Sequence, residues 1–493
     1  MTRPAFRLPL PGRRRRLPAD TPEPVEPALQ GAATTDASEL ERIVGWLDER
    51  TGMASVARGA MRKVFPDHWS FLLGEVALFC FIILVLTGTF LTFFYVPSAE
   101  LVTYDGPYEP LRGAEVSAAF ASVVEVSFEV RAGLLMRQVH HWTALVFVGA
   151  IALHMSRVFF TGAFRRPREI NWLIGSGLLL LGLAEGFTGY SLPDDLLSGT
   201  GLRIAYSAAL SIPFIGPNLA FLVFGGEFPT EQIVSRLYVF HILLLPGLYI
   251  AGIAVHILLT WIQKHTQYPG GRAREENVVG PSFWPVQVFR STGLFFLTAA
   301  VVTLVAGLVQ INPVWSYGPF IPHTVTVPAQ PDYYVGWLEG ALRLGPAFEP
   351  VILGITIPSP FIPGVLVPGI IFTIITLWPF IEARISGDRR PHHILDLPWQ
   401  APGRTAIGAA VLTFFLIQTL AGGNDVLATF LDVQVETLTL AFQVLQVALP
   451  IAVAVIVYRI CRERLRRGRS VVAAPGGVAL RRTADGGFEE SEP

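Results

Sequence analysis

The sequence predicts an all-α protein that crosses a membrane eight times. Of its 493 residues, 52% are hydrophobic and only 15% are charged, and the mean hydropathy is +0.50. A water-soluble protein of this size could not cover so much apolar surface. Eight apolar stretches have about the length at which one helix spans a bilayer. They cover residues 71–95, 139–160, 172–192, 237–262, 286–311, 361–381, 405–420 and 437–458.

The charges between these stretches predict the orientation of the chain. Short loops rich in Lys and Arg remain on the cytoplasmic side of a membrane. Basic clusters precede the first stretch and follow the second, fourth, sixth and eighth, whereas the other loops are mostly acidic or neutral. We therefore expect a multi-pass protein of the cell membrane with both termini in the cytoplasm. Membrane lipids, and no nucleic acid, are expected among its partners.

Composition also divides the chain into tails and a membrane part. Residues 1–36 are rich in Pro and Arg and lack the apolar core of a signal peptide, so we expect a disordered cytoplasmic tail. Residues 37–68 interleave charges with apolar residues and predict an amphipathic helix on the cytoplasmic surface. Residues 466–493 are expected to form a second flexible tail. The membrane part, residues 69–465, is divided below.

Four histidines lie in two of the apolar stretches, where polar residues are rare. His140 and His154 are fourteen residues apart, so on one α-helix they return to nearly the same face about 21 Å farther along. His241 and His256 are fifteen apart, which leaves their rings roughly 60° out of phase on a regular helix. Each helix therefore offers one ligand near each face of the membrane.

These pairs predict two b-type haems stacked across the bilayer in a four-helix bundle. Bis-histidine ligation fills both axial positions of haem iron and favours electron transfer over oxygen binding. The predicted orientation places His140 and His241 near the outer face and His154 and His256 near the inner face. Each haem would thus take one ligand from each helix.

Neighbouring residues exclude other arrangements. His141 lies thirteen residues before His154, a rotation of roughly 220°, so His140 is the better ligand. Only two cysteines, Cys80 and Cys461, are present, which excludes an iron–sulfur cluster and a disulfide framework. No Cys-x-x-Cys-His motif for covalent haem attachment occurs.

Small and basic residues recur around the histidines. Two glycine pairs in the first and third stretches repeat the fourteen-residue interval, namely Gly74 with Gly88 and Gly175 with Gly189. They predict space for haem, although glycines also simply let membrane helices touch. Three arginines flank the ligand-bearing stretches, namely Arg137, Arg157 and Arg236. A guanidinium suits a haem propionate, or else serves as an interfacial anchor.

These motifs resemble cytochrome b of the quinol:cytochrome c oxidoreductases, over about residues 69–465. The haem pattern is similar in Arg137-Gln138-Val139-His140, His154-Met155-Ser156-Arg157, and Arg236 followed by His241 and His256. Pro331-Asp332-Tyr333-Tyr334 resembles the Pro-Glu-Trp-Tyr signature of the quinol-oxidising pocket, and Gly189-Tyr190-Ser191-Leu192-Pro193 resembles the Gly-Tyr-x-Leu-Pro motif. The Arg-rich extension, the fifteen-residue spacing and residues 134–142 resemble the actinobacterial form, whose complexes use menaquinol.

The resemblance implies a proton-motive Q cycle. Quinol is oxidised at the outer face, one electron leaves for a Rieske iron–sulfur subunit, and the other crosses the membrane to reduce quinone near the inner face. It further implies a c-type cytochrome subunit, a homodimer, and a possible supercomplex with a terminal oxidase. Residues 69–265 would form the di-haem bundle, and residues 266–465 the C-terminal domain whose additional helices and loop build the quinol site.

The site residues follow from this comparison and from proton chemistry. A quinol hydroxyl must lose its proton as its electron leaves, which suits Asp332 as general base. Tyr334 would orient the quinol or merely pack, and Glu339 would supply or relay the proton instead. At the inner face, Lys264 and His265 are candidate proton donors or surface anchors. Two departures from the family are Asp332-Tyr333 for Glu-Trp, and Asp194-Asp195 after Pro193 in place of Trp-Gly.

Two alternatives remain. Prolines within apolar stretches and buried polar residues also occur in secondary transporters, but no inverted internal repeat is visible. A simpler di-haem anchor of another dehydrogenase would need only four to six helices and no Pro-Asp-Tyr-Tyr loop. A carrier would lack the visible absorption of a reducible b-type haem.

Overall fold

The computed structural model describes residues 39–228, 230–270, 272–324, 330–472, 479–482 and 488–491. Eight helices among these residues are long and apolar enough to span a membrane, as predicted. The only strands in the described parts form three short antiparallel pairs, so the all-α class is confirmed. The predicted tail over residues 1–36 lies outside the described residues, as do residues 473–478, 483–487 and 492–493 of the tail predicted over 466–493, whereas helix α17 continues through the first residues of that segment to Val472. The chain forms two units, Met1–Ala60 and Met61–Pro493.

The first unit contains two helices where the sequence predicts one. Helix α1 (Glu39–Thr51) and α2 (Met53–Met61) are separated by Gly52, whose φ of +63° lies in the left-handed region. A helix cannot continue through that conformation, which glycine adopts without strain. Ile43 and Trp46 are more than half exposed, in keeping with an apolar face available to a membrane surface.

The spans keep the predicted order but differ at their ends. Four spans lie in a single helix, namely Gly133–Phe160 (α5), Glu169–Ser191 (α6), Pro402–Gly422 (α15) and Val435–Arg467 within α17 (Val435–Val472). Three join two elements each: Trp69–Thr92 joins η1 (Trp69–Phe71) and α3 (Leu72–Thr92), Phe283–Leu308 joins η4 (Phe283–Gln287) and α11 (Val288–Leu308), and Ile362–Ser386 joins η5 (Ile362–Leu366) and α14 (Val367–Ser386). The span Ile233–Gln263 joins α9 (Ile233–Val239), η3 (Phe240–Leu244) and α10 (Leu245–Gln263). Helix α5 begins six residues before the predicted stretch, so His140 lies two turns inside it.

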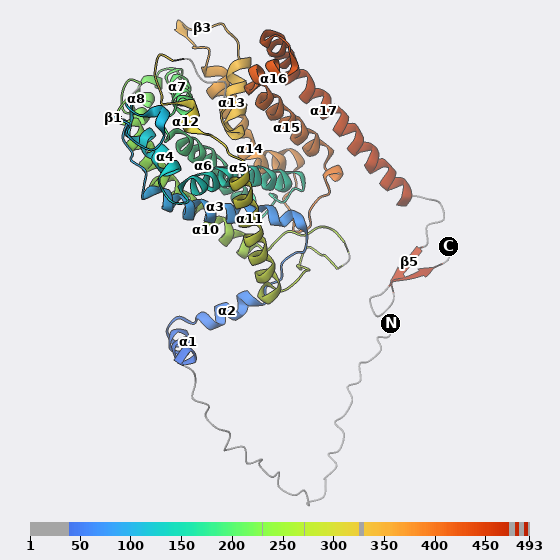
Figure 1. The fold of residues 1–493 in the computed structure, drawn as a ribbon. Coiled ribbons are helices and arrows are strands. Elements are labelled where there is room, and N and C mark those ends of the chain that lie inside the picture. Colours follow the sequence, from blue (N-terminus) through green and yellow to red (C-terminus); the bar gives the residue numbers. More distant parts are fainter. Residues whose placement is uncertain are drawn as a thin grey trace, which may run out of the picture. The chain divides into compact units, whose positions relative to one another are not determined.

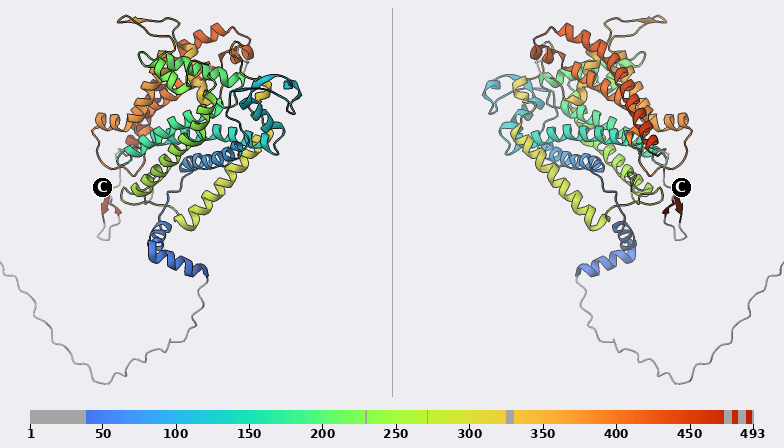
Figure 2. Two further views of the ribbon diagram at one scale, coloured as in Figure 1. Left: turned by 90° about the vertical axis from the view of Figure 1, so that its left-hand side faces the viewer. Right: turned by 90° about the vertical axis from the view of Figure 1, so that its right-hand side faces the viewer.

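Helices α3, α5, α6 and α10 form the central bundle (Figures 1 and 2). Its buried middle is filled by Cys80, Phe147, Leu178 and Tyr249. The Tyr249 hydroxyl donates to the Leu178 carbonyl at 2.7 Å, which satisfies a polar atom that would otherwise be buried without a partner. This packed layer lies between the two ends of the bundle at which the histidines are found.

Two spans contain a π-helical segment just before a proline. Segment η3 ends two residues before Pro246, and η5 ends two residues before Pro368. Proline has no N–H and its ring clashes with the carbonyl four residues earlier, so a wider turn relieves the clash. These prolines therefore alter the helical phase without ending the spans.

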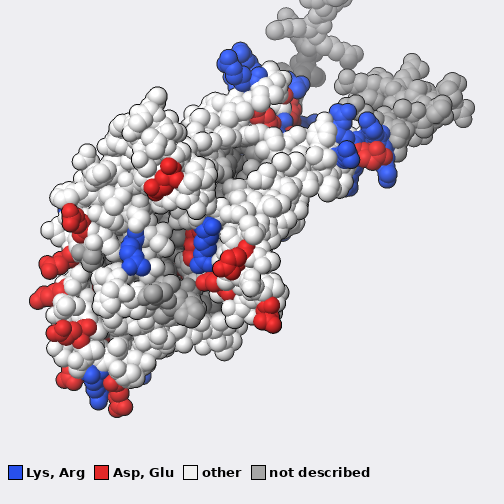
Figure 3. All heavy atoms as spheres, turned by 90° about the horizontal axis from the view of Figure 1, so that it is seen from above, with Lys and Arg blue, Asp and Glu red and all other residues white. Residues whose placement is uncertain are grey.

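Short elements cover one end of the bundle. They are β1 (Leu101–Thr103), η2 (Glu109–Leu111), β2 (Glu115–Ser117), α4 (Ala118–Phe128), α7 (Leu196–Leu210), α8 (Gly216–Phe224) and α12 (Val314–Tyr317). Strands β1 and β2 pair with Val102 opposite Val116. In Figure 3 acidic side chains lie mostly over one end of the face shown, with a few basic side chains among them, whereas Lys and Arg side chains cluster at the other end.

The C-terminal helices position the Pro-Asp-Tyr-Tyr loop. Helix α13 (Tyr333–Leu344) packs on α15, and α15 packs on α17. A Cβ built on Gly340 would lie 1.8 Å from the Gln418 carbonyl oxygen, so only glycine permits this approach of α13 to α15. The remaining elements are β3 (Val351–Ile352), β4 (Ile355–Thr356), η6 (Pro398–Gln400), α16 (Asn424–Leu431), β5 (Ala479–Arg482) and β6 (Phe488–Ser491).

Candidate haem and quinone sites

The four histidines meet in two pairs, one at each end of the bundle. The ring centroids of His140 and His241 are 6.2 Å apart, and those of His154 and His256 are 6.4 Å apart. The rings of each pair are steeply inclined, at 78° and 74°. A metal ion with bonds of about 2 Å to a nitrogen on either side would hold two imidazole centres roughly 6 Å apart. Both separations therefore fit an axially ligated iron.

The π-helical segment explains how a fifteen-residue spacing serves the same purpose as fourteen. Within η3 the Leu245 N–H donates to the Phe240 carbonyl, five residues earlier. Such a turn holds one residue more than an α-turn and takes up the extra residue between His241 and His256. The offset of roughly 60° expected for a regular helix is thereby corrected.

Each predicted glycine faces one of the imidazole rings. A Cβ built on Gly74 would lie 3.0 Å from His154 Cε1, on Gly88 3.2 Å from His140 Cε1, on Gly175 3.4 Å from His256 Cε1, and on Gly189 2.4 Å from His241 Cε1. The glycines of α3 thus face the histidines of α5, and those of α6 face the histidines of η3 and α10. The atom nearest to each glycine's Cβ position belongs to an imidazole ring, so each glycine limits where that ring can lie.

Hydrogen bonds orient the rings of the pair formed by His140 and His241. His140 Nδ1 is 2.9 Å from Thr87 Oγ1, and His241 Nδ1 donates to the Glu185 carbonyl at 3.1 Å. A partner on Nδ1 leaves Nε2 free to bind a metal. Among the described residues, His154 Nδ1 has no hydrogen-bond partner.

Two of the three predicted arginines carry buried donors that need an acceptor. The Nε and Nη2 atoms of Arg137 and Arg157 find no acceptor within the described parts of the chain. Arg157 lies over the Phe71 ring at 4.1 Å, and Arg137 lies 5.6 Å from the Trp315 ring centre. Buried guanidinium groups are costly unless paired, and a carboxylate such as a haem propionate would satisfy them. Arg236 differs, because it already donates to the Leu222 carbonyl at 2.7 Å and is partly exposed.

In a third cluster, His141 lies against Asp332, the predicted base. Both carboxylate oxygens of Asp332 lie 2.9 Å from His141 Nε2, and Tyr334 donates to Asp332 Oδ2 at 3.0 Å. Burial raises the pKa of Tyr334 well above its ordinary value, and the Asp332 charge raises it further, so the hydroxyl remains a donor. The Tyr334 ring packs against Gly186, where a Cβ would lie 2.7 Å away.

Comparison with known proteins decides the family. A family model described as cytochrome b (N-terminal)/b6/petB matches residues 145–319. The cytochrome bc1 complex cytochrome b subunit of Streptomyces coelicolor is 47% identical over 436 residues, covering 88% of this chain and 79% of that protein. The subunit of the same name from Mycobacterium tuberculosis is 48% identical over 434 residues, with the same coverage.

The chain belongs to the cytochrome b subunits of cytochrome bc1 complexes. It is accordingly a respiratory electron-transport protein and a catalytic membrane subunit of a quinol–cytochrome c reductase, with haem b and quinone as its cofactors and substrate. A solved chain titled "Hyperthermophilic respiratory Complex III" shares the fold, with a TM-score of 0.62 and 20% identity over 85% of this chain and 99% of that one. The transporter and dehydrogenase-anchor alternatives receive no support from these relatives.

In this cytochrome b, Glu339 is engaged elsewhere in α13. Its carboxylate pairs with Arg343, which also bonds Asp425 at 3.0 Å and so links α13 to α16. Burial raises the pKa of Glu339, and the adjacent Arg343 opposes that rise. The roles of Asp332 and Glu339 as proton acceptors both stay predictions.

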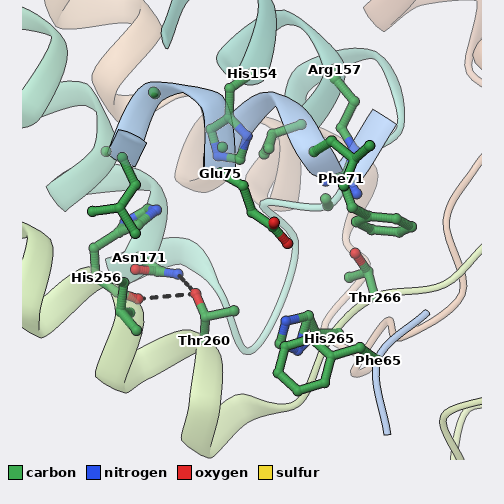
Figure 4. Close-up of a pocket in the computed structure, with 18 of the residues that line it drawn as sticks. Phe65, Phe71, Glu75, His154, Arg157, Asn171, His256, Thr260, His265 and Thr266 are labelled. Atoms are coloured by element: carbon green, nitrogen blue, oxygen red, sulfur yellow. Dashed lines mark hydrogen bonds between the residues drawn. The ribbon is translucent and has the colours of Figure 1, made fainter. Parts of the chain in front are cut away.

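At the end of the bundle that holds His154 and His256, a cavity of about 860 Å³ is lined by both residues and extends to the predicted donors Lys264 and His265. Figure 4 shows His154, His256 and His265 around it. His265 lines this cavity, with its ring 4.4 Å from that of Phe65. Burial, followed by the charges of nearby basic residues, lowers the pKa of His265 to about 4. Lys264 also reaches the cavity wall, but its side chain is exposed and Nζ lies 3.5 Å from the Glu276 carbonyl.

Sequence reasoning missed the residues that hold the ring nitrogens. Thr87 and Thr188 each precede a glycine that faces a ligand ring, and Thr188 Oγ1 lies 3.3 Å from His241 Nδ1. The repeated Thr-Gly dipeptide was a signal that could have found them. His141 was set aside as a ligand, and its side chain instead contacts Asp332.

Proposed function

We propose that this cytochrome b holds two b-type haems, one between His140 and His241 and one between His154 and His256. The observation that carries the proposal is the pair of ring separations, 6.2 and 6.4 Å, repeated at two levels of one bundle. Gly74, Gly88, Gly175 and Gly189 leave room for the rings. Bound haems supply one-electron carriers at both levels of the membrane.

The propionates of these haems are proposed to meet Arg137 and Arg157. Their unpartnered guanidinium nitrogens support this role, because a buried charge and its donors need a counter-group. Arg236 remains a third candidate, although its present bonds favour an anchoring role between α8 and α9.

Quinol oxidation is proposed at the outer level, with Asp332 as the proton acceptor. One quinol gives up two electrons and two protons, and the Asp332 carboxylate takes a proton from a quinol hydroxyl within hydrogen-bond reach. The Tyr334 hydroxyl holds one carboxylate oxygen, and His141 holds the group from the other side. Glu339 is the alternative carrier of that proton.

Quinone reduction is proposed at the inner level, beside the cavity that His265 and Lys264 line. The electron crosses the membrane between the two levels, and protons enter on the inner side, so a proton-motive Q cycle results. We assign menaquinol as the quinol because the chain resembles the actinobacterial form. Comparing turnover with a naphthoquinol and a benzoquinol tests that assignment.

The remaining assignments concern surroundings and partners. The protein is proposed to lie in the cell membrane with both termini in the cytoplasm, since its arginine clusters fall on that side of the eight spans. Its proposed partners are a Rieske iron–sulfur subunit, a c-type cytochrome subunit and a second copy of the chain, with a possible supercomplex with a terminal oxidase. Affinity purification of the tagged chain and identification of the copurified subunits tests this set.

Haem stoichiometry tests the central proposal. The purified complex is analysed for b-type haem by extraction and absorption, relative to the amount of this chain. We expect two haems per chain and a reducible b-type band. One haem per chain, or none, would contradict the assignment of the four histidines.

A further inference from the structure

Glu75 is a carboxylate near the inner end of a membrane-spanning helix. It lies on α3 next to Gly74, and thus close in the chain to the glycine that faces His154. An acidic residue within a span is costly, so it is by default a candidate for a functional site. Glu75 also lines the inner cavity, which gives the side chain a space to act in.

The partners of Glu75 are neutral donors. Gln287 Nε2 donates to Glu75 Oε1 at 2.9 Å, and Ser291 Oγ donates to Glu75 Oε2 at 2.7 Å. The other acid among the described residues that line the cavity is Asp67, whose carboxylate pairs with Arg290 at 3.1 Å. Glu75 thus differs from Asp67 in having its two oxygens held by an amide and a hydroxyl rather than by a cation.

The cavity extends beyond the inner histidine pair. Beyond His154 and His256 it continues to an aromatic wall that includes Phe65 and Trp261. In Figure 4 the Glu75 side chain extends from α3 toward the region where His265 lies. A cavity with aromatic walls and polar side chains among them suits a planar quinone head with its two oxygens.

We propose that Glu75 delivers a proton to the quinone reduced at this inner site. The proposal rests on the proposed inner quinone site and names its acid. One quinone takes two electrons and two protons to become quinol. The Glu75 carboxyl relays one proton from water to a quinone oxygen, which forms the new O–H bond, and Gln287 and Ser291 hold its two oxygens before and after the transfer. The second proton comes from water on the same side. Water on the cytoplasmic side returns the proton past the exposed Asp67.

His265 is less suited to this role. Its ring lies against Phe65, with ring centres 4.4 Å apart, and burial together with nearby basic residues lowers its pKa, which disfavours a second proton on the imidazole. A neutral ring can still accept or donate a hydrogen bond that orients the quinone. His265 is therefore assigned to positioning, and Glu75 to proton delivery.

The test measures reoxidation of pre-reduced b-type haem by 1,4-naphthoquinone in the assembled complex, in an Asp332→Asn background that slows the outer reaction. Adding Glu75→Gln keeps the shape of the side chain but removes its acid. We expect reoxidation to slow by at least about tenfold, because positioned proton donors contribute roughly 10²–10⁴ in rate. Glu75→Asp restores part of the rate. The matched control is Glu436→Gln, an exposed residue at the start of α17, which leaves the rate unchanged.

Three results separate the possibilities. Slow reoxidation with normal haem content in Glu75→Gln, together with partial recovery in Glu75→Asp, supports the proposal. An unchanged rate in Glu75→Gln overturns it and reduces Glu75 to a link between α3 and α11. If the background protein itself is not reoxidised by the quinone, the inner quinone site is wrong and the proposal falls with it. If Glu75→Gln loses haem, the same rate is measured in Ser291→Ala, which removes one donor to Glu75. Slower reoxidation in that variant supports the proposal, and an unchanged rate overturns it.

Discussion

The two ends of the bundle, which the proposed orientation makes the outer end (His140 and His241) and the inner end (His154 and His256), use the same histidine and glycine pattern but differ in what surrounds it. At the outer end Nδ1 of each ligand has a hydrogen-bond partner, and Gly189 leaves the His241 ring little freedom. At the inner end His154 Nδ1 has no partner among the described residues, and a large cavity adjoins the rings. One end is thus closely held, and the other is open to a second ligand.

The two ends of the bundle also differ in their polar side chains. The outer end presents acids, with Asp332 held by His141 and Tyr334, and Asp194 and Asp195 nearby in the chain after α6. The inner end presents Arg157, His265 and Glu75. A site that releases protons needs an acceptor, and a site that takes them up needs a donor fed from the cytoplasm. These differences agree with the proposed oxidation of quinol at the outer end and reduction of quinone at the inner end.

The largest effect is expected from Asp332→Asn. The amide keeps the shape but cannot accept the quinol proton, so we expect quinol oxidation to fall by about 10²-fold or more. Steady-state turnover of the assembled complex measures this, while absorption spectra check that both haems are retained. Unchanged turnover would transfer the role of base to another residue, with Glu339 the next to test.

A matched pair of glycine substitutions compares how tightly the two ends are packed. Gly189→Ala places a Cβ 2.4 Å from the His241 ring, whereas Gly175→Ala places one 3.4 Å from the His256 ring. Overpacking of this kind costs about 1–3 kcal/mol. We expect Gly189→Ala to weaken or lose the outer haem and Gly175→Ala to retain both, as read from haem content and thermal stability. If both variants retain both haems equally well, the two ends of the bundle do not differ in how tightly they are packed.

Thr87→Val is expected to raise the midpoint potential of the outer haem. A hydrogen bond to Nδ1 raises the basicity of the ligand and stabilises the oxidised iron. Loss of a bond worth about 0.5–1.5 kcal/mol corresponds to a shift of roughly 20–60 mV. Redox titration of the b-type bands measures it, and the inner haem is the internal control. A shift in the inner band instead would reverse the assignment of the two levels.

The smallest effect is expected in the corner after α6. Burial raises the pKa of Asp195 to about 6, against hydrogen bonds from Ser198 and the charge of Arg137. The folded corner then holds a proton that the unfolded chain releases near pH 4, so its stability falls as the pH rises from about 4 to about 6. Asparagine also caps helices well, so Asp195→Asn should keep α7 while weakening this pH dependence. Hydrogen exchange of residues 192–203 in both proteins checks this, and an equally steep dependence in the variant would contradict it.

Much of this architecture could be predicted from the sequence, because hydropathy and the fourteen-residue interval are properties of single helices. The eight spans and the pairing of His140 with His241 follow from such regularities. The ends of the spans and the break at Gly52 could not be predicted in this way, because they depend on local backbone conformation. The correction of the fifteen-residue spacing lies in a π-turn before Pro246, which periodicity alone does not reveal.

The finer site depends on contacts between distant segments. Glu75 meets Gln287 and Ser291 more than two hundred residues later, and His141 meets Asp332 at a similar separation. No local pattern joins such residues, so the sequence suggested Lys264 and His265 for the inner site on position alone. The folded structure adds Glu75 to these two candidates, because its side chain lines the same cavity.

The most direct test of two haems at two levels is a redox titration of His241→Ala beside His154→Ala. Each variant removes one ligand from one pair and leaves the other pair intact. The account predicts that each complex loses one b-type component and retains the other, with different components lost in the two variants. Retention of both components in either variant, or loss of the same component in both, would contradict it.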